Sequence, residues 1–380
     1  MKTLRIGIMG GRGRVGSECL DYLLRETSHD IVIGGRTRPE EESLWNRDGG
    51  RVSFLQGDLT RNDYLAGFCG ACDIVVNCAG PSALIKDRVA LAALEQGAHY
   101  VDPGGHNPLY HALTARRGEL EAKRLIFVLA TGILPGLSEL FPIHETGSRF
   151  DVIDSLDYQY IGRDRWTRAS AYDIAWGVGN IGHGEASLVY ENGQPKEVNL
   201  LTSGITVRLP PPLGKQKLYP VFREELREFV EKRGIRQARV HGNNWGLGVS
   251  LATILVRLAG WYKTERQLWQ SAGLIARGAR WDLRGKAPGF MLHLVAQGSQ
   301  NGRHGTVTST LFLEDTYRAT GICAGIAARM VAEGSLAPGR FWASQLPDAG
   351  AFMRLFLEQG YVVEHGKTGE QLALAPEGAA

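Results

Sequence analysis

The sequence predicts an α/β protein in which a doubly wound parallel sheet is followed by an inserted α+β domain containing an antiparallel sheet. Three observations predict this fold class. Short apolar runs alternate with helical patterns over residues 1–136, a glycine-rich loop joins the first run to the first helix, and after residue 136 the runs alternate polar and apolar residues. Strands that alternate with helices form βαβ units, which build parallel sheets.

The composition is that of an ordinary globular chain and excludes several protein classes. Of 380 residues, 43% are hydrophobic and 22% are charged, as in soluble domains. Basic and acidic residues nearly balance, with a net charge of +3, whereas a protein that binds nucleic acid is usually strongly basic. No apolar run approaches the ~18 residues of a membrane span. Five scattered cysteines and the lack of a secretion signal predict reduced thiols in a cytoplasmic protein.

Six strand-like runs are expected in the first domain, residues 1–136. They cover residues 4–9, 31–35, 51–55, 73–78, 99–102 and 125–129, with helices expected at 15–24, 64–68 and 86–96. Cys69 and Cys72 form a C-x-x-C pair directly before the fourth run. A structural zinc site would need a second pair, so no metal is expected.

The second domain is expected over residues 137–315. Its strand-like runs cover residues 152–161, 205–209, 237–241, 290–297 and 306–313, with a hairpin over 187–201. Helical patterns cover 221–233 and 250–280, and a third segment, 316–380, contains helices at 316–332 and 352–359 and a strand-like run at 361–363. Alternation with one apolar face is typical of antiparallel sheets. We expect the strands 290–297 and 306–313 to need cover for that face.

A glycine-rich loop between the first strand and the first helix predicts a dinucleotide site. It contains G-x-G-x-x-G at Gly11, Gly13 and Gly16. Glycines allow a tight turn and a close backbone approach, and the helix N-terminus then meets a pyrophosphate. The expected contacts of this loop are Gly10, Gly11, Gly13, Arg14, Val15 and Gly16.

The end of the second strand predicts NADP as the cofactor. An acidic residue here would bind the ribose 2′-hydroxyl of NAD, but the chain has Arg36, Thr37 and Arg38, and no carboxylate before Glu40. Arginine binds a phosphate through two parallel hydrogen bonds and stacks on flat rings. We therefore expect these three residues to hold the 2′-phosphate and the adenine.

Two further strand ends should border the cofactor. Asp58 and Leu59 follow the third strand, at the corner where such sheets place the adenine. The fourth strand ends in a run of small residues that allows close approach to the cofactor ribose. This run is Cys78, Ala79, Gly80 and Pro81.

The segment around the fourth and fifth strands carries a family resemblance. It reads Cys-Asp-Ile-Val-Val-Asn-Cys-Ala-Gly-Pro at 72–81, and a helix then leads to Gly-Ala-His-Tyr-Val-Asp at 97–102. This pattern resembles the NADP-binding domain of the saccharopine dehydrogenase family, as do the turn at 132–138 and the stretches 317–321 and 338–339. The resemblance covers residues 1–145 and 315–362 and is loose between them.

The resemblance implies an architecture and a chemistry. It implies a Rossmann domain, an inserted domain whose sheet is often shared with a second subunit in a homodimer, and C-terminal helices that return to the first domain. It also implies hydride exchange between NADP and a carbon–nitrogen bond.

Reduction of a C=N bond also needs a proton on nitrogen, from a general acid or from water. His106 follows the fifth strand on a glycine hinge, Tyr172 opens a helix after the first strand of the second domain, and His183 lies in a glycine-rich polar loop. These three are the catalytic candidates. For each of them a purely structural role is the alternative.

Three functions are compatible with these observations. The first is an imine reductase, such as one that reduces a thiazoline on a carrier protein during siderophore assembly. Six of the eight tryptophans lie in the second domain, which suits a flat substrate. The basic clusters Arg163/Arg165/Arg168 and Arg277/Arg280/Arg284/Lys286 suit an acidic carrier. The second is a saccharopine- or opine-type amino-acid dehydrogenase, whose carboxylate clamps the same clusters could supply, and the third is a non-catalytic NADP-binding regulator.

Overall fold

The computed structural model describes residues 3–37, 50–104, 107–180, 188–199 and 202–366. It divides into two compact units, Met1–Leu140 with Thr316–Gln359, and Phe141–Asp315 with Gly360–Ala380. The first boundary thus falls at 140/141, where the sequence suggested 136/137. The C-terminal segment does not return to the first unit as a whole, because β16 (Val363–His365) pairs with β14 (Arg303–Leu313) of the second unit.

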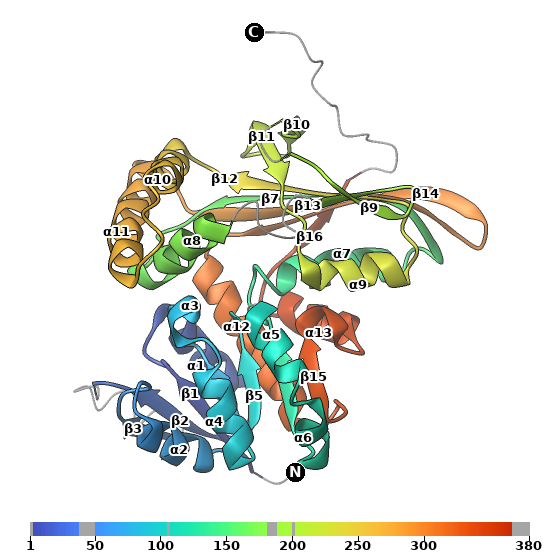
Figure 1. Ribbon diagram of the computed structural model, residues 1–380. Coiled ribbons are helices and arrows are strands. Elements are labelled where there is room, and N and C mark those ends of the chain that lie inside the picture. Colours follow the sequence, from blue (N-terminus) through green and yellow to red (C-terminus); the bar gives the residue numbers. More distant parts are fainter. Residues whose placement is uncertain (1–2, 38–49, 105–106, 181–187, 200–201, 367–380) are drawn as a thin grey trace. The chain divides into compact units, whose positions relative to one another are not determined.

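The first unit contains a parallel seven-stranded sheet (Figure 1). Its order is β15-β6-β5-β4-β1-β2-β3. The strands are β1 (Arg5–Met9), β2 (Asp30–Gly35), β3 (Val52–Gln56), β4 (Ile74–Asn77), β5 (His99–Asp102), β6 (Ile126–Leu129) and β15 (Gly339–Trp342). The helices are α1 (Arg14–Glu26), α2 (Asn62–Gly70), α3 (Ser82–Ile85), α4 (Arg88–Gln96), α5 (Asn107–Thr114), α6 (Arg117–Ala122), α12 (Thr316–Ala332) and α13 (Ala349–Leu357). The doubly wound Rossmann sheet predicted from the sequence is confirmed, and β15 adds a strand that the sequence did not indicate.

The strand order indicates where a ligand would bind to this sheet. The chain runs outward from β1 to β2 and β3, and then crosses back to β4 on the other side of β1. The connections therefore reverse direction between β1 and β4, and in such sheets the ligand binds at the carboxyl ends of those two strands. Residues 6, 8 and 74–76 of these strands are at most 1% exposed, as expected of strands with both faces covered.

The first unit is completed by α12, which packs against α1. A Cβ on Gly321 would lie 2.5 Å from the carbonyl oxygen of Val15, and a Cβ on Gly325 would lie 2.5 Å from the ring of Tyr22. Two glycines one helical turn apart therefore let the helices approach more closely than side chains would permit. This contact fixes the N-terminal turn of α1, where the cofactor loop ends.

The second unit contains a mixed sheet. Its order is β10-β11-β12-β7-β13-β14-β16, with β8 on β12 and β9 on β8. The strands not yet given are β7 (Val152–Arg163), β8 (Leu188–Glu191), β9 (Gln194–Glu197), β10 (Ile205–Leu209), β11 (Gly214–Pro220), β12 (Gln237–Asn244) and β13 (Gly289–Gln300). The central pair β12–β7 is parallel and its neighbours are antiparallel, so the expected antiparallel sheet has one parallel pair.

The long helix expected in the second unit is divided into two. The helices of this unit are α8 (Arg168–Asn180), α9 (Glu224–Lys232), α10 (Leu247–Leu258) and α11 (Glu265–Asp282), and α7 (Leu137–Gly147) spans the boundary between the units. The single helix expected over 250–280 is broken, because Thr264 and Gln267 form a capping box that starts α11. None of the described helices is long and apolar enough to cross a membrane.

The apolar face of β13 and β14 is already covered within this chain. Leu292, Leu294, Leu311 and Leu313 have no exposed surface. The sequence expected this face to need cover, and the covering residues belong to the same subunit. The homodimer therefore stays a prediction that this face does not support.

A row of buried polar residues crosses the middle of the second sheet. Gln159 on β7 pairs with His241 on β12 and with His293 on β13, and His293 pairs with Thr310 on β14. All four are at most 7% exposed, and a ring nitrogen of His293 lies 2.8 Å from the Thr310 hydroxyl. Burial lowers the pKa of both histidines to about 4, so both are neutral at pH 7.

We predict that Gly321→Ala destabilises the protein and that Gly273→Ala does not. The first added methyl group collides with the backbone of α1, which costs roughly 1–3 kcal/mol. Gly273 lies in α11 with open space around its Cα, so alanine there should stabilise the helix by up to about 1 kcal/mol. Urea unfolding of both variants measures the difference, and equal stabilities would show that α12 and α1 are not in close contact.

We predict that stability falls between pH 7 and pH 5. Each buried histidine binds a proton more strongly in the unfolded chain than in the fold, so stability is lost as pH falls below 6.5 towards 4. The expected loss is roughly 2 kcal/mol per histidine at pH 5. His293→Gln should reduce this dependence, whereas His304→Gln, at an 80% exposed side chain, should leave it unchanged. Denaturant unfolding at the two pH values measures this loss. The prediction would be contradicted if His293→Gln lost as much free energy of unfolding between pH 7 and pH 5 as the unmodified protein does.

Candidate cofactor site

The glycine loop lies directly after β1 and against the end of β4. The Gly10 N–H donates to the Gly34 carbonyl at 2.9 Å, and the Gly13 N–H donates to the Gly10 carbonyl at 2.8 Å. Gly10 has φ +74°, and a Cβ on it would lie 2.8 Å from the Cα of Ala79. A Cβ on Gly16 would collide with the Gly10 carbonyl oxygen. The loop therefore requires glycine at both positions, and the notch it forms stays clear of side chains.

The N-terminus of α1 begins at this loop and is electropositive. Gly13 is the N-cap, no described side chain caps the helix, and its first turn holds no acidic residue. Such a terminus stabilises an anion. The Arg14 guanidinium lies 3.8 Å from the centre of the Tyr317 ring on α12. The Arg14 side chain thus packs within the unit, while the backbone of Arg14 and Val15 belongs to the helix end.

Two arginines, Arg36 and Arg12, come together at the end of β2, although Arg12 belongs to the glycine loop. Arg36 and Thr37 are exposed, and the Arg36 carbonyl accepts a hydrogen bond from Gln56 Nε2 at 3.1 Å. Arg12 reaches over from the glycine loop, and its guanidinium donates to the Thr37 carbonyl at 2.9 Å. Arg38 lies outside the described residues. Sequence reasoning missed Arg12, although a cation inside the glycine motif was a visible signal.

Asp58 and Leu59 follow β3 as expected. The Asp58 carboxylate accepts the Thr60 N–H at 2.9 Å. This bond, together with the Thr60 side chain and the charge of Arg36, lowers the pKa of Asp58. Leu59 packs against the core of the unit. Asp58 therefore stabilises its own turn as an ionised carboxylate beside the cationic end of β2.

The small residues after β4 form the other wall of the crevice. Ala79 lies against Gly10, Gly80 is exposed and Pro81 is buried. The Cys78 thiol is hydrogen-bonded to the thiol of Cys19, and this hydrogen bond together with burial raises the pKa of Cys78. Cys78 thus stays a protonated thiol and serves as a wall residue.

The C-x-x-C pair lies in the hydrophobic core. Burial raises the pKa of both Cys69 and Cys72 to about 12, so neither is a reactive thiolate. In the part of the chain that the structure describes, no three His, Cys, Asp or Glu side chains are grouped so that they could hold a metal ion.

A buried polar cluster at the ends of β4 and β5 was not identified from the sequence. The Tyr100 hydroxyl donates to Asp102 Oδ2 at 2.6 Å, Asn77 Nδ2 donates to the Tyr100 oxygen at 3.2 Å, and the Gly104 N–H donates to Asp102 Oδ1 at 2.7 Å. Burial, followed by the charge of Asp102 and the hydrogen bond to it, raises the pKa of Tyr100 well above its usual value. Asn77 Oδ1 is buried and has no hydrogen-bond partner among the described residues.

Of the three catalytic candidates, only Tyr172 is among the described residues. His106 and His183 lie outside them. Tyr172 is in the second turn of α8, not at its start, and is 3% exposed, with its ring centre 4.7 Å from that of Trp269. Burial raises its pKa. This packing supports the structural alternative for Tyr172, and the catalytic roles of all three stay predictions.

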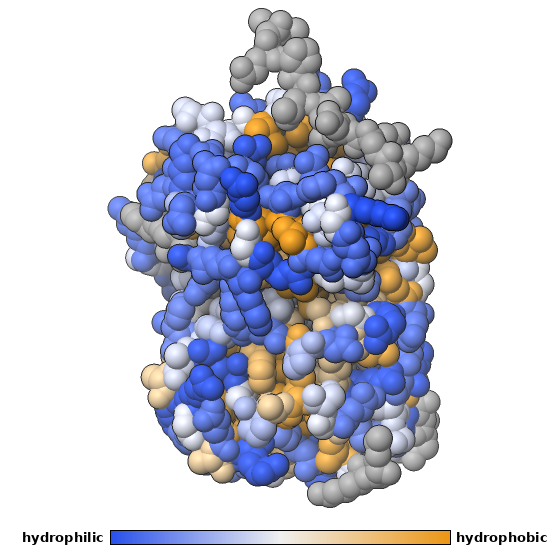
Figure 2. Space-filling model, turned by 90° about the vertical axis from the view of Figure 1, so that its right-hand side faces the viewer, coloured by the Kyte–Doolittle hydropathy of each residue, from blue (hydrophilic) through white to orange (hydrophobic). Residues whose placement is uncertain are grey.

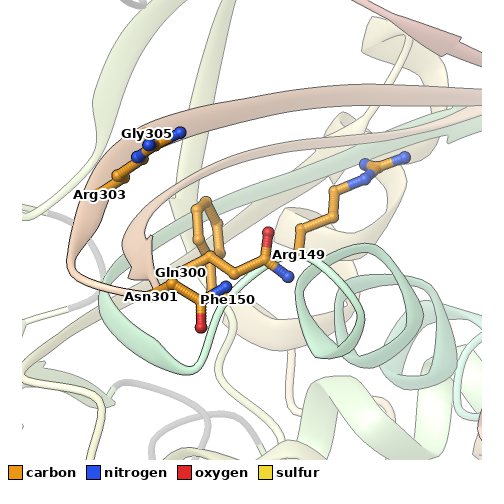
Figure 3. A pocket seen from close by; sticks show the side chains of 6 residues that line it. All are labelled: Arg149, Phe150, Gln300, Asn301, Arg303 and Gly305. Carbon is orange, nitrogen blue, oxygen red and sulfur yellow. The ribbon is translucent and has the colours of Figure 1, made fainter.

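A hollow of about 550 Å³ lies at the turn of the β13–β14 hairpin in the second unit (Figure 3). It is lined by Arg149, Phe150, Gln300, Asn301, Arg303 and Gly305. The guanidinium of Arg149 points away from the turn in Figure 3 and forms an ion pair with Glu145. The hollow contains none of the predicted site residues.

The residues of the crevice fit a dinucleotide. The positions of Gly10 and Gly16 form a notch that a Cβ would fill. The unpaired oxygen of Asn77 lies at the carboxyl end of β4, where the fold places the reacting half of the cofactor. An amide N–H such as that of nicotinamide is the type of donor this oxygen lacks.

Comparisons with known proteins agree with this interpretation of the first unit. Residues 6–128 match the family model described as the saccharopine dehydrogenase NADP binding domain. No curated protein sequence matches the chain.

A solved structure shares the fold over nearly the whole chain. The apo saccharopine dehydrogenase (L-Glu forming) from Saccharomyces cerevisiae aligns with a TM-score of 0.65 at 14% identity, covering 97% of this chain and 100% of the other. The DAP dehydrogenase of C. glutamicum aligns with a TM-score of 0.45 at 12% identity, covering 94% and 96%. At 14% identity, the likeness to the yeast enzyme shows the fold alone. The sequence match over residues 6–128, together with the glycine loop and the cationic end of β2, confirms NADP as the cofactor.

Proposed function

We propose that this protein is an NADPH-dependent reductase of a C=N bond, acting on an imine such as a thiazoline that is bound to a carrier protein. The observation that carries the proposal is the cationic end of β2 beside an intact glycine loop, in a domain of the saccharopine dehydrogenase type. A cytoplasmic location and a role in siderophore assembly belong to the same proposal.

The residues of the first unit would bind and orient the cofactor. Arg36, with Arg12 beside it, would bind the 2′-phosphate, and the N-terminus of α1 would bind the pyrophosphate. The nicotinamide supplies the hydride when it is bound. Asn77 would orient the carboxamide, and the hydrogen bonds of Tyr100 and Asp102 would keep the Asn77 side chain in place. His106 stays the first candidate for the proton donor.

The arginines of the second unit favour an imine over an amino acid and a keto acid. The Arg163 guanidinium stacks 3.7 Å from the Trp245 ring centre and donates to the Ala287 carbonyl. Arg168 donates to the Trp269 carbonyl at 3.5 Å. Two members of this cluster thus support local packing, whereas an opine-type dehydrogenase needs cations that bind substrate carboxylates. The amino-acid dehydrogenase remains the second candidate, and the non-catalytic regulator remains the third.

We predict that Arg36→Ala weakens NADPH binding and leaves NADH binding nearly unchanged. The lost charge-assisted bond to the 2′-phosphate should cost roughly 1.5–3 kcal/mol, or about tenfold to a hundredfold in affinity. Titration followed by calorimetry measures both cofactors. Arg117→Ala, an exposed arginine on α6, is the matched control. Equal affinity of the unmodified protein for NADH and NADPH would contradict the assignment.

We predict that NADPH is consumed with a thiazoline on a carrier domain or on a small thioester mimic, and not with pairs of free amino acids and keto acids. The absorbance of NADPH follows both reactions under identical conditions. Turnover only with an amino acid and keto acid pair would replace this proposal with the opine-type dehydrogenase. No turnover with either class, while NADPH still binds, would favour the regulator.

A further inference from the structure

The helix α10 exposes a continuous apolar stripe. Leu247, Leu251, Ile254 and Leu258 are 68%, 60%, 55% and 81% exposed. Their spacings of four, three and four residues repeat the heptad pattern by which one helix packs against another. The opposite side of α10 is buried through Val249, Ala252 and Val256. We call the four exposed residues and their neighbour Leu255, 47% exposed, the α10 seam.

Two exposed tryptophans extend the seam at its ends. Trp261 follows α10 and is 44% exposed, and Trp281 on α11 is 49% exposed. Trp281 lies next to the first turn of α10, since a Cβ on Gly248 would be 2.8 Å from its ring. Seam and tryptophans together expose on the order of 500 Å² of apolar surface. This is about the apolar area that one partner contributes to a standard protein interface.

The surroundings of the seam are strongly basic. Residues 257–286 contain seven Lys or Arg and only two acidic residues, Glu265 and Asp282. Asp282 is buried and accepts the Gly248 and Val249 N–H groups, so Glu265 is the one exposed carboxylate of this described stretch. The segment has a net charge of +5 in a chain whose net charge is +3. Its positive charge is therefore local.

We propose that the α10 seam docks an acidic, amphipathic helix of a partner protein. The heptad spacing selects a helix, the apolar area is sufficient for an interface, and the basic surroundings select a negative charge. A second copy of this chain is less suited, because pairing α10 with itself would bring two basic segments together. If the proposed function holds, this partner is the carrier protein that bears the imine.

The location of the seam suits a large partner. In Figure 1, α10 and α11 lie at one end of the second unit and the β13–β14 hairpin lies at the other. Figure 2 views the molecule from the hairpin side, where hydrophobic groups lie among hydrophilic residues.

A peptide titration tests the proposal independently of catalysis. The probe is a three-heptad synthetic helix with Leu at a and d and Glu elsewhere, and the same peptide with Lys in place of Glu is its counterpart. The emission of Trp261 and Trp281 reports binding. The Glu peptide should bind, and its affinity should fall by at least about tenfold between about 0.05 and 0.5 M salt. The Lys peptide should not bind.

Three variants of the full chain define the surface. Leu251→Glu and Arg280→Glu should each lower the affinity for the Glu peptide by about tenfold or more. Val362→Glu, at a 71% exposed apolar residue beside β16, should have no effect. Because all three side chains are exposed, the fold should survive, and circular dichroism checks this. The proposal would be overturned if the Glu and Lys peptides bound equally well, or if Leu251→Glu bound the Glu peptide as tightly as the unmodified protein does.

The other occupants of the seam are separate outcomes. If the protein in solution has twice the monomer mass of 41.5 kDa and Leu251→Glu has the monomer mass, the proposal is overturned in favour of a second copy. Binding of anionic lipid vesicles with no binding of the Glu peptide would overturn it in favour of a membrane surface.

A kinetic arm links the seam to the proposed function. Leu251→Glu should raise KM for the carrier-bound imine and leave the rate with the small thioester mimic unchanged. If neither substrate is reduced, the proposed function fails while the peptide titration still decides on the seam. If the mimic is reduced and Leu251→Glu leaves KM for the carrier-bound imine unchanged, the carrier is not the partner and the proposed reaction stands.

Discussion

Close backbone approach at the carboxyl ends of β1 and β4 is the constraint on which the rest of the first unit depends. Gly10 has φ +74° and lies against Ala79, and Gly16 leaves room for the Gly10 carbonyl. If either carried a side chain, α1 would have to move away from the sheet. A similar close approach joins the next two elements, because Gly321 and Gly325 let α12 pack closely against α1. A series of glycine contacts thus connects the cofactor loop to α12, and the notch at Gly10 and Gly16 exists because no Cβ fills it.

Positive charges around the cofactor loop add to the effect of its geometry. The N-terminus of α1 carries no acidic residue in its first turn, so a pyrophosphate there would meet the positive end of the helix dipole. Arg12 and Arg36 extend this potential to the end of β2, where an NAD enzyme would have a carboxylate. The Arg12 bond to the Thr37 carbonyl holds one cation in place before any ligand arrives. Such preorganisation reduces the entropy lost on binding, which is the reason to expect strong discrimination from an exposed site.

The predictability of the two units differs for a physical reason. In the first unit the signals are local: apolar runs of four to six residues, glycines at fixed offsets and cations at a strand end, all within residues 4–129. The sequence therefore predicted six of its strands and the cofactor. In the second unit the decisive contacts join distant segments. The parallel pairing of β12 with β7 and the row from His241 to Thr310 have no local signature, and β11 and the break between α10 and α11 were missed.

The same reasoning explains which site residues escaped sequence analysis. Arg12 acts through a partner 25 residues away, and Tyr100 acts through Asn77 on another strand; neither pairing follows from spacing. Helical periodicity shows that α10 has apolar residues on nearly every side, but not which side the fold buries. Only packing against α8 and α11 leaves Leu247, Leu251, Ile254 and Leu258 outside. An apolar heptad stripe normally indicates a core, and here the fold turns it outward beside a local excess of positive charge. A seam that the described residues do not cover is most simply explained by a partner with a complementary helix.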